Sequence, residues 1–347
     1  MNDEKDPDIR PFAPARRSAI RVSAPDLVRF EPLRPECGLP LLATPSVAGV
    51  DLVSWAGANR DFLRSGLLAA GGILFRGFDV GDSERFEQLI RTVSGPLLEY
   101  NYGSTPRSRV GGNIYTSTEY PSHQEIPLHN EMSYSRDWPL NIWFFCLQAS
   151  PVGGETPIAD SRRVFDRVDR SVRERMISRG VLYVRNYGEG LDVPWRKVFQ
   201  TEDRSEVERF CRSADIDFEW GDGDRLRTRE VCQAAERHPV TGEMVWFNQA
   251  HLFHVSNLPA ETREQLLATC GEEGLPRNSY YGDGTPFEGG ELAQIREAYR
   301  SEAVVFPWQS GDVLMLDNML SSHARKPYSG ARRVIVGMAE PWREAKA

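Results

Sequence analysis

A histidine and a glutamate two residues apart are the first side chains in this sequence that could do chemistry together. They are His129 and Glu131, in the segment IPLHNEMSY. In an extended strand, residues i and i+2 project from the same face, so an imidazole nitrogen and a carboxylate oxygen at this spacing can reach one metal ion. A His-X-Glu triplet also occurs often by chance, so the motif is a weak signal by itself.

A third ligand has to come from elsewhere in the chain, and His323 is the candidate. It follows the strand-like run DVLMLDN (312–318) and lies in a polar segment that we expect to form a turn. Two histidines and one carboxylate on one face leave three coordination positions open, which is typical of non-haem Fe(II) oxygenases. The sequence therefore predicts an iron centre made of His129, Glu131 and His323.

The other four histidines carry weaker signals. We expect His123 in a loop and His238, which precedes a proline, at the surface. His251 and His254 are three residues apart and could share one helical face toward a metal ion. No acidic residue stands at ligand spacing beside them, so we interpret them as packing or substrate-pocket residues.

A basic pair, Arg332 and Arg333, opens the apolar run RRVIVGMA (332–339). One guanidinium reaching inward from such a strand can bind a carboxylate through two parallel hydrogen bonds. Consecutive strand residues face opposite sides, so at most one of the two points into a pocket. Thr156, in GGETPIADS, could supply a second donor. The alternative is that both arginines form a solvated pair at a sheet edge.

The composition is ordinary for a globular protein. Its 347 residues are 40% hydrophobic and 27% charged, and the formal net charge of −8 argues against nucleic acid as a partner. No apolar run approaches the length of a membrane span, and no secretory signal is visible. The five scattered cysteines contain no CxxC pair and indicate reduced thiols. We therefore expect a cytoplasmic protein.

The order of the predicted elements favours a mainly β fold with flanking helices. We expect residues 1–22, which are polar and lack periodicity, to form a disordered tail, and residues 23–347 to form one domain with helical insertions. Beyond residue 110 the strand-like runs do not alternate strictly with helices, which favours an antiparallel sandwich or jelly roll over a doubly wound parallel sheet. The expected strands are 71–78, 140–149, 181–187, 243–248, 303–308, 312–318 and 332–339, and the expected helices are 51–70, 83–94, 161–180 and 259–274.

Taken together, the HNE triplet, GGET, the distal histidine and the Arg-Arg strand resemble the taurine dioxygenase / clavaminate synthase-like family of Fe(II)/2-oxoglutarate oxygenases. The order and spacing of these features agree with the family from about residue 70 to 340. The resemblance implies a double-stranded β-helix (jelly roll) with Fe(II) on His129, Glu131 and His323. It also implies that Thr156 contacts 2-oxoglutarate and that Arg333 pairs with its distal carboxylate.

The identity of the acidic ligand refines this resemblance. Glu131, in place of the commoner aspartate, matches the clavaminate-like branch of the family. The family's halogenases have a small residue there, so Glu131 implies oxygen chemistry. Some members carry a second arginine four residues beyond the 2-oxoglutarate arginine, where it holds an acidic substrate. Here that position is Gly337, so a substrate held in that way is not implied.

Segments such as IYTSTEYP, VWFNQAHLFH and YYGDG are similar to a subgroup found with nonribosomal peptide assembly, typified by the syringomycin aspartyl hydroxylase. This similarity implies hydroxylation of an amino-acid-type substrate in natural-product biosynthesis, with the substrate free or bound to a peptidyl carrier protein, and O₂ as co-reactant. Five polar residues could contact such a substrate: Gln124, Glu125, Asn130, Asn248 and His251. Asn248 and His251 could instead satisfy buried backbone groups.

Two other classes of protein remain open from the residues themselves. A zinc hydrolase could use the same three ligands with a water molecule at an open position, although no general-base motif such as HExxH is present and the arginine pair would have no role. A non-catalytic jelly-roll binding protein could retain the ligands without turnover.

Overall fold

The computed structural model describes residues 27–99, 102–103, 107–117, 120–188 and 193–343. The expected tail, residues 1–22, lies outside the described residues. Among the helices that are described, none is both long enough and apolar enough to cross a membrane.

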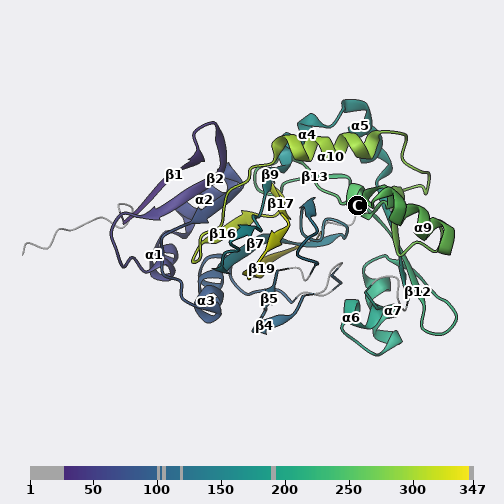
Figure 1. Ribbon diagram of the computed structural model, residues 1–347, viewed down its shortest axis with the longest axis horizontal. Coiled ribbons are helices and arrows are strands. Elements are labelled where there is room, and N and C mark those ends of the chain that lie inside the picture. The colour runs from purple at the N-terminus through teal and green to yellow at the C-terminus, as the bar shows by residue number, and fades with distance from the viewer. Residues whose placement is uncertain (1–26, 100–101, 104–106, 118–119, 189–192, 344–347) are drawn as a thin grey trace, which may run out of the picture.

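An eight-stranded sheet runs through the middle of the molecule (Figure 1). Its strand order is β1-β2-β3-β16-β7-β19-β5-β4, and neighbouring strands are antiparallel except for β2 and β3, which are parallel. The strands are β1 (Val28–Arg34), β2 (Cys37–Pro45), β3 (Gly72–Phe75), β4 (Arg109–Gly111), β5 (Ile114–Thr116), β7 (Asp137–Gln148), β16 (Val313–Asp317) and β19 (Arg333–Arg343).

The two faces of this sheet belong to two different cores, because alternate side chains of a strand project to opposite sides. Trp143 and Phe145 of β7 join a core formed with three N-terminal helices. Phe144 of β7 and Val336 of β19 face the other way and join an inner core. The three helices are α1 (Leu52–Ala58), α2 (Arg60–Ala70) and α3 (Ser83–Ser94).

A second, three-stranded sheet packs on the inner core and completes a two-layer β structure. Its order is β6-β17-β9, and its neighbouring strands are antiparallel. Ile158 of β9 lies in the same buried cluster as Phe144 of the large sheet. The strands are β6 (Ile126–His129), β9 (Ile158–Asp160) and β17 (Ser321–Arg325), with a short pair formed by β8 (Val152–Gly153) and β18 (Tyr328–Ser329).

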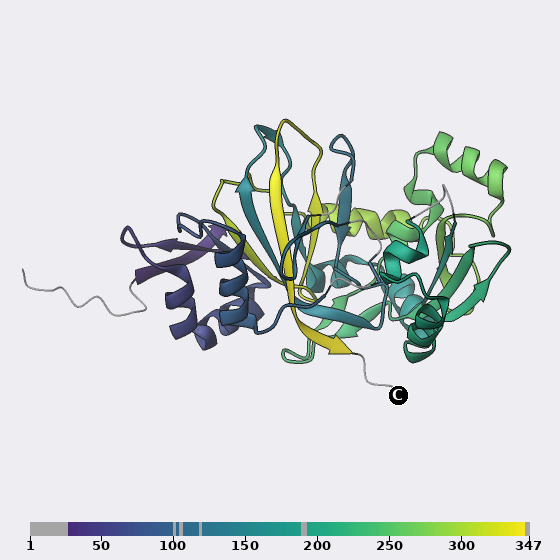
Figure 2. The ribbon, with the colours of Figure 1, turned by 90° about the horizontal axis from the view of Figure 1, so that it is seen from below.

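The insertions form a further part that lies beside the central sheets, away from α1–α3, in both ribbon views (Figures 1 and 2). Its four-stranded sheet has the order β11-β12-β10-β15. The strands here are β10 (Val181–Tyr187), β11 (Asp217–Trp220), β12 (Leu226–Cys232), β13 (Ala235–Arg237), β14 (Met244–Trp246) and β15 (Arg277–Tyr281). The helices are α4 (Ser161–Arg167), α5 (Arg170–Arg179), α6 (Trp195–Phe199), α7 (Arg204–Ser213), α8 (Ala250–Phe253), α9 (Ala260–Cys270) and α10 (Glu291–Glu302), with a 3₁₀ turn at Val255–Asn257.

Two of the expected helices are broken, and one expected strand is missing. The expected helix 51–70 is interrupted at Asn59, which separates α1 from α2. The expected helix 161–180 stops before Asp169, whose carboxylate accepts a backbone N–H bond and starts α5 as a new N-cap. Residues 303–308 form an isolated bridge in place of the expected strand.

Candidate metal centre

His129 and His323 are direct neighbours across two antiparallel strands. β6 and β17 pair so that the Cα atom of His323 is the partner of that of His129. Opposed residues on one face have Cβ atoms about 5 Å apart, and the two imidazole rings have centroids 4.5 Å apart. His323 was expected in a turn, but it lies inside β17. Strand register therefore brings the second histidine to the first.

Glu131 lies just beyond the end of β6 and not within an extended strand, as the i, i+2 argument had assumed. The backbone turns there, and the next residue, Met132, has a φ of 57°. The side chain of Asn318 holds Glu131 in place: its Oδ1 accepts the Glu131 N–H at 2.7 Å and its Nδ2 donates to the Glu131 carbonyl at 2.9 Å. One side chain thus supplies both hydrogen bonds that a neighbouring strand would provide.

Three ligand atoms, one each from His129, Glu131 and His323, lie within 4.8 Å of one another. His323 Nε2 is 3.7 Å from Glu131 Oε2. Burial lowers the pKa of His129 and holds the pKa of His323 well below its ordinary value, which favours the neutral imidazoles that bind metals. His129 Nδ1 donates to the Pro127 carbonyl at 2.8 Å, which leaves Nε2 with the lone pair.

An arginine that the sequence analysis missed contacts this centre. Arg107 Nη2 is 2.6 Å from Glu131 Oε2, and the two side chains are only 3% and 5% exposed. Arg107 lies in the segment NYGSTPRSRV, which shows no periodicity and no motif. No local pattern marks it, because its position depends on the path of a loop.

A cavity lies beside the two histidines. Thr156 lines it as expected; the residue is buried, and its hydroxyl accepts a hydrogen bond from Trp308 Nε1 at 3.0 Å. The cavity wall also contains several arginines, and no carboxylate is found in it among the described residues. The lining residues are Arg107, Ser117, Ile126, His129, Phe144, Thr156, His323, Ala324, Arg325 and Arg332.

Arg332 lines the cavity and Arg333 does not, which contradicts the expected pairing of Arg333 with 2-oxoglutarate. The Arg333 side chain is exposed. Along β19, Val334 and Val336 face the inner core, and Arg332 lies on their side by the same alternation. Opposite Arg333, β7 contains one extra residue that has no partner in β19 (a β-bulge). The side chains of β19 therefore continue to alternate between its two faces. The choice between the two arginines was therefore wrong by one position.

The electrostatic surroundings of Arg332 favour an anion. Burial, and the nearby positive charge of Arg325, lower the pKa of the Arg332 guanidinium to about 10. Arg325 donates to the backbone carbonyls of residues 120, 121 and 124, which hold it in place, and no acidic side chain pairs with it in the part of the chain that the structure describes. A carboxylate that entered between these groups would offset buried positive charge.

In some family members a second arginine, four residues beyond the 2-oxoglutarate arginine, holds the substrate. If Arg332 takes the place of Arg333, the corresponding position here also moves by one residue. Four residues beyond Arg332 is Val336, which belongs to the same buried cluster as Phe144 of the cavity wall. Gly337 faces the opposite side, where an added Cβ would lie 2.5 Å from Ile90 Cδ1 of α3. Neither position carries an arginine, so the expected departure from the family pattern holds at the corrected position as well.

None of the five predicted substrate contacts lines this cavity. Gln124 and Glu125 are exposed, and Glu125 pairs with Lys326 at 2.8 Å. The three buried residues bond to main-chain carbonyls, at 2.6 Å for Asn130, 2.6 Å for Asn248 and 3.0 Å for His251. This cavity therefore gives no support to the five predictions, and the hydrogen bonds of Asn248 and His251 match the alternative, satisfaction of buried backbone groups.

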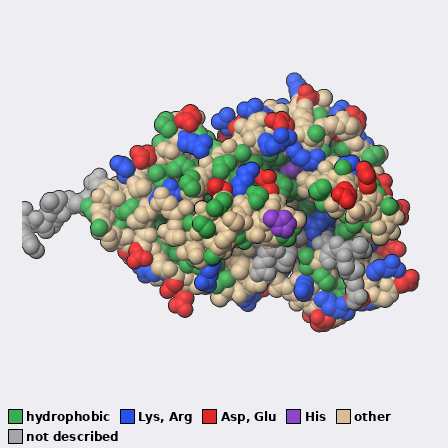
Figure 3. All heavy atoms as spheres, in the orientation of Figure 1, with side chains coloured by type: hydrophobic (Ala, Val, Ile, Leu, Met, Phe, Trp, Pro, Cys, Tyr) green, Lys and Arg blue, Asp and Glu red, His purple; other side chains and the backbone are tan. Residues whose placement is uncertain are grey.

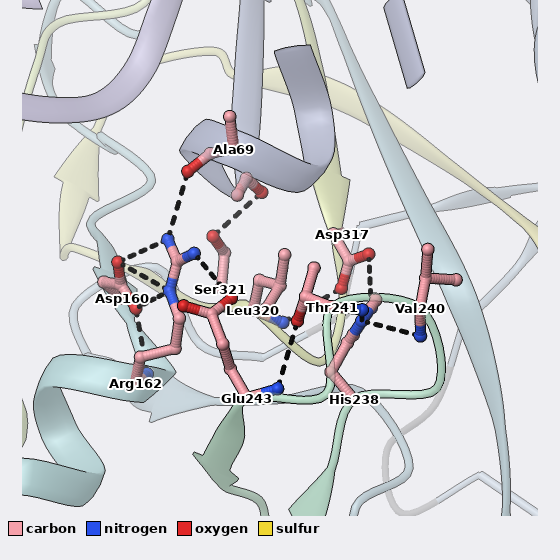
Figure 4. Close-up of polar contacts among 11 residues, drawn as sticks. Ala69, Asp160, Arg162, His238, Val240, Thr241, Glu243, Asp317, Leu320 and Ser321 are labelled. Carbon is pink, nitrogen blue, oxygen red and sulfur yellow. Dashed lines mark hydrogen bonds and ion pairs between the residues drawn. The ribbon is translucent and has the colours of Figure 1, made fainter. Parts of the chain in front are cut away.

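A buried polar network supports the turn that carries Asn318 (Figure 4). One oxygen of Asp317 accepts two N–H bonds from residues 319 and 320, and the other is 3.1 Å from His238 Nε2. His238 Nδ1 accepts N–H bonds from residues 240 and 241, so Nε2 carries the proton and donates to Asp317. His238 is buried and was wrongly expected at the surface.

Comparison with known proteins decides the family. A sequence model described as "Taurine catabolism dioxygenase TauD, TfdA family" matches residues 29–339. The chain belongs to this family. It is 41% identical over 271 residues to the dapdiamide synthesis protein DdaC of Enterobacter agglomerans, which covers 78% of this chain and 82% of that protein. It is 31% identical over 296 residues to a clavaminate synthase-like protein of Arabidopsis thaliana, covering 81% and 85% of the two chains.

The fold of this TauD-family chain also matches solved structures. PvcB of Pseudomonas aeruginosa aligns with a TM-score of 0.54 over 93% of this chain and 94% of its own, at 17% sequence identity. The jelly-roll prediction is confirmed, although the sheets are mixed and not closed.

Family membership also decides between the classes of protein that the residues left open. The chain is an Fe(II)/2-oxoglutarate-dependent oxygenase, in place of a zinc hydrolase or a non-catalytic binding protein. The donor set fits these groups, since two imidazoles and one carboxylate suit Fe(II), and a partly buried arginine in the adjoining cavity, Arg332, suits a dicarboxylate.

Asn318→Ala should weaken metal binding although it removes no ligand. Both hydrogen bonds to the Glu131 backbone would be lost, so the carboxylate would no longer be held beside the histidines. We expect metal affinity to fall by roughly tenfold or more, as for other residues that orient ligands. Anaerobic titration calorimetry with Mn(II) measures this change.

The matched control is Asn278→Ala, which removes another buried asparagine with hydrogen bonds of its own. It should lower the melting temperature and leave Mn(II) affinity unchanged. Equal Mn(II) affinity in wild type and Asn318→Ala would contradict the role assigned to the Asn318 side chain.

Proposed function

We propose that this oxygenase hydroxylates an amino-acid-type substrate, free or bound to a carrier protein, in natural-product biosynthesis. The observation that carries the proposal is the 41% identity, over about four fifths of each chain, to a protein named for dapdiamide synthesis. The resemblance of several segments to the syringomycin aspartyl hydroxylase subgroup supports the same class of substrate.

In this proposal the iron is held by His129, Glu131 and His323. These two imidazoles and one carboxylate would hold Fe(II) and would leave room on the metal for 2-oxoglutarate and O₂. The convergence of the three ligand atoms supports the assignment, and so does the burial that keeps both imidazoles neutral. Arg107 and Asn318 hold the Glu131 carboxylate and backbone.

Arg332 is the proposed partner of the distal carboxylate of 2-oxoglutarate, with Thr156 beside it in the same cavity wall. The Arg332 side chain is partly buried, and its Nε donates to the Gly154 carbonyl at 2.8 Å, which fixes its orientation. A pre-oriented planar donor set favours bidentate binding of a carboxylate.

When bound, iron and 2-oxoglutarate supply the oxidising power, and 2-oxoglutarate is converted to succinate and CO₂. The residues of the chain position the reacting C–H bond and limit the access of water. Ile126 and Phe144 provide apolar cavity wall beside the two histidines for this purpose.

His129→Ala, Glu131→Ala and His323→Ala should each remove Fe(II)-dependent succinate formation, because two remaining ligands bind the metal far more weakly. His123→Ala, at an exposed position, is the matched control and should keep wild-type activity. Metal content and succinate release are measured on the same preparations. The assignment fails if all three variants retain near-normal metal content and succinate production.

Arg332→Ala should raise the apparent KM for 2-oxoglutarate far more than Arg333→Ala does. Loss of a charge-assisted bidentate pair costs about 1.5–3 kcal/mol, or roughly one to two orders of magnitude in affinity. Steady-state kinetics at varied 2-oxoglutarate measures both variants. A larger effect of Arg333→Ala would show that the exposed arginine, and not the cavity arginine, binds the cosubstrate.

The proposed substrate class is tested by presenting amino acids both free and as carrier-protein thioesters. Succinate release coupled to a product heavier by one oxygen atom is the expected result for at least one amino acid. Faster oxidation of the thioester would support the carrier, whereas efficient oxidation of the free amino acid with no gain on tethering would exclude it. Turnover confined to substrates without an amino-acid unit would overturn the proposal.

A further inference from the structure

We propose that the indole of Trp308 orients the Thr156 hydroxyl so that it donates a hydrogen bond to the distal carboxylate of 2-oxoglutarate. Trp308 would thereby help the protein to distinguish 2-oxoglutarate from 2-oxo acids that lack this carboxylate. Trp308 does not line the cavity itself and acts through Thr156, so it is a positioning residue. This inference rests on the proposed function, since it deepens the assignment of that cavity to 2-oxoglutarate.

Selection of a dicarboxylate has to come from groups inside the cavity. The chain carries a formal net charge of −8, and acidic and basic side chains are interspersed over the face shown in Figure 3. That face offers no general attraction for anions. Arg332 and Thr156, the proposed contacts of the distal carboxylate, both lie in the cavity wall. The direction in which the Thr156 hydroxyl donates is therefore one of the features that can select the cosubstrate.

The hydrogen bond between Trp308 and Thr156 determines how the hydroxyl can be used. Indole Nε1 only donates, and it lies 3.0 Å from Thr156 Oγ1. Thr156 is 2% exposed and Trp308 is 8% exposed, so water has little access to either group. The indole N–H occupies one lone pair of the hydroxyl oxygen, and among the residues that the structure describes none accepts the hydroxyl proton in turn. The proton is therefore available to an acceptor in the cavity.

An ionised carboxylate matches this polarity, because it only accepts hydrogen bonds. A hydroxyl that rotates freely has to be ordered when the ligand binds, and that ordering weakens binding. With the indole N–H on one of its lone pairs, the Thr156 hydroxyl is already restricted before the ligand arrives. A donor that is oriented in advance stabilises negative charge better than one that must reorganise.

The backbone on both sides of Trp308 is anchored by one ion pair. Arg76 Nη2 donates to the Pro307 carbonyl at 2.9 Å, and Asp312 Oδ2 accepts the Gln309 N–H at 2.8 Å. Arg76 and Asp312 also bond to each other at 2.6 Å, and the Asp312 side chain is almost fully buried. The indole is therefore held in position by the fold and needs no contact with the ligand.

Thr156 and Arg332 are linked through the short segment 154–156. Arg332 Nε donates to the Gly154 carbonyl at 2.8 Å, two residues before Thr156. Gly154 has a φ of 77°, and a Cβ atom there would lie 2.9 Å from Arg332 Cδ, so glycine permits this close approach. The hydroxyl and the guanidinium are thus both tied to this segment, which favours their binding one carboxylate together.

The test measures binding, without turnover, to the full-length protein loaded with Mn(II). Calorimetry compares two probes. N-oxalylglycine is found with Mn(II) in a solved structure of the same fold. N-methyloxamate has the same metal-chelating oxalyl group and lacks the distal carboxylate. We expect the wild type to bind N-oxalylglycine about tenfold or more tightly than N-methyloxamate. Trp308→Phe, which keeps an aromatic ring and removes the N–H, should reduce this preference by roughly three- to tenfold, through weaker binding of N-oxalylglycine alone.

A double-mutant cycle with Thr156→Val shows whether Trp308 acts through the hydroxyl. Thr156→Val should itself lower the preference for N-oxalylglycine, because it removes the donor. Trp308→Phe added to Thr156→Val should then cause little further change. Thr156→Ser keeps the hydroxyl and should retain the preference.

Trp143→Phe is the matched control, because Trp143 Nε1 also donates to a buried hydroxyl, that of Ser94 at 3.2 Å, on the other face of the large sheet. It should lower the melting temperature and leave the preference unchanged. If Trp308→Phe fails to fold, the test variant carries benzothienylalanine at position 308, which has the shape of tryptophan with sulfur in place of the N–H.

An unchanged preference in the variants at position 308 would overturn the inference. Equal weakening of both probes, which a purely structural role predicts, would overturn it too, and so would additive effects in the double-mutant cycle. None of these results affects the proposed function, which is judged by succinate release and product mass. Equal binding of the two probes to the wild type would instead refute the 2-oxoglutarate site on which both proposals depend.

Discussion

The metal centre depends on the register between β6 and β17. Because His129 and His323 are paired residues of two antiparallel strands, their imidazoles lie side by side, and no loop is needed to position them. A slip of one residue would turn His323 to the opposite face of the sheet and separate the ligands. The register is held on the other side of β17 by its pairing with β9, where His323 opposes Ile158 of the buried core.

The third ligand is positioned in a different way, because Glu131 lies beyond the residues of β6 that pair with β17. The side chain of Asn318 bonds to both backbone groups of Glu131, and Asn318 itself lies in the turn between β16 and β17. That turn is held by Asp317 and the buried His238. The acidic ligand and the second histidine are therefore positioned by the same short connection, so damage to it would affect both.

The sequence predicted the features that depend on residue type and spacing. The three candidate ligands and Thr156 could be chosen from residue type, spacing and the resemblance to the family, and the structure brings the three ligands together with Thr156 in the adjoining cavity wall. The choice of Arg333 over Arg332 was wrong because it depends on which face of β19 meets the cavity, a property of tertiary packing. Arg107 was missed for a related reason, since only the folded loop brings it to Glu131.

The predicted substrate contacts and the broken helices show the same limit of sequence patterns. The sequence alone does not distinguish an asparagine that binds substrate from one that bonds to the backbone. In the structure, Asn130 and Asn248 bond to backbone carbonyls. The breaks at Asn59 and Asp169 interrupt continuous helical patterns, and the caps that end them are short-range contacts with weak signals.

The central claim is that one buried site holds both iron and 2-oxoglutarate. It is tested most directly by an anaerobic crystal structure with Mn(II) and 2-oxoglutarate. The metal should be bonded to His129, Glu131 and His323, with the distal carboxylate of 2-oxoglutarate on Arg332. Metal at another site, or 2-oxoglutarate bound away from Arg332, would contradict the account.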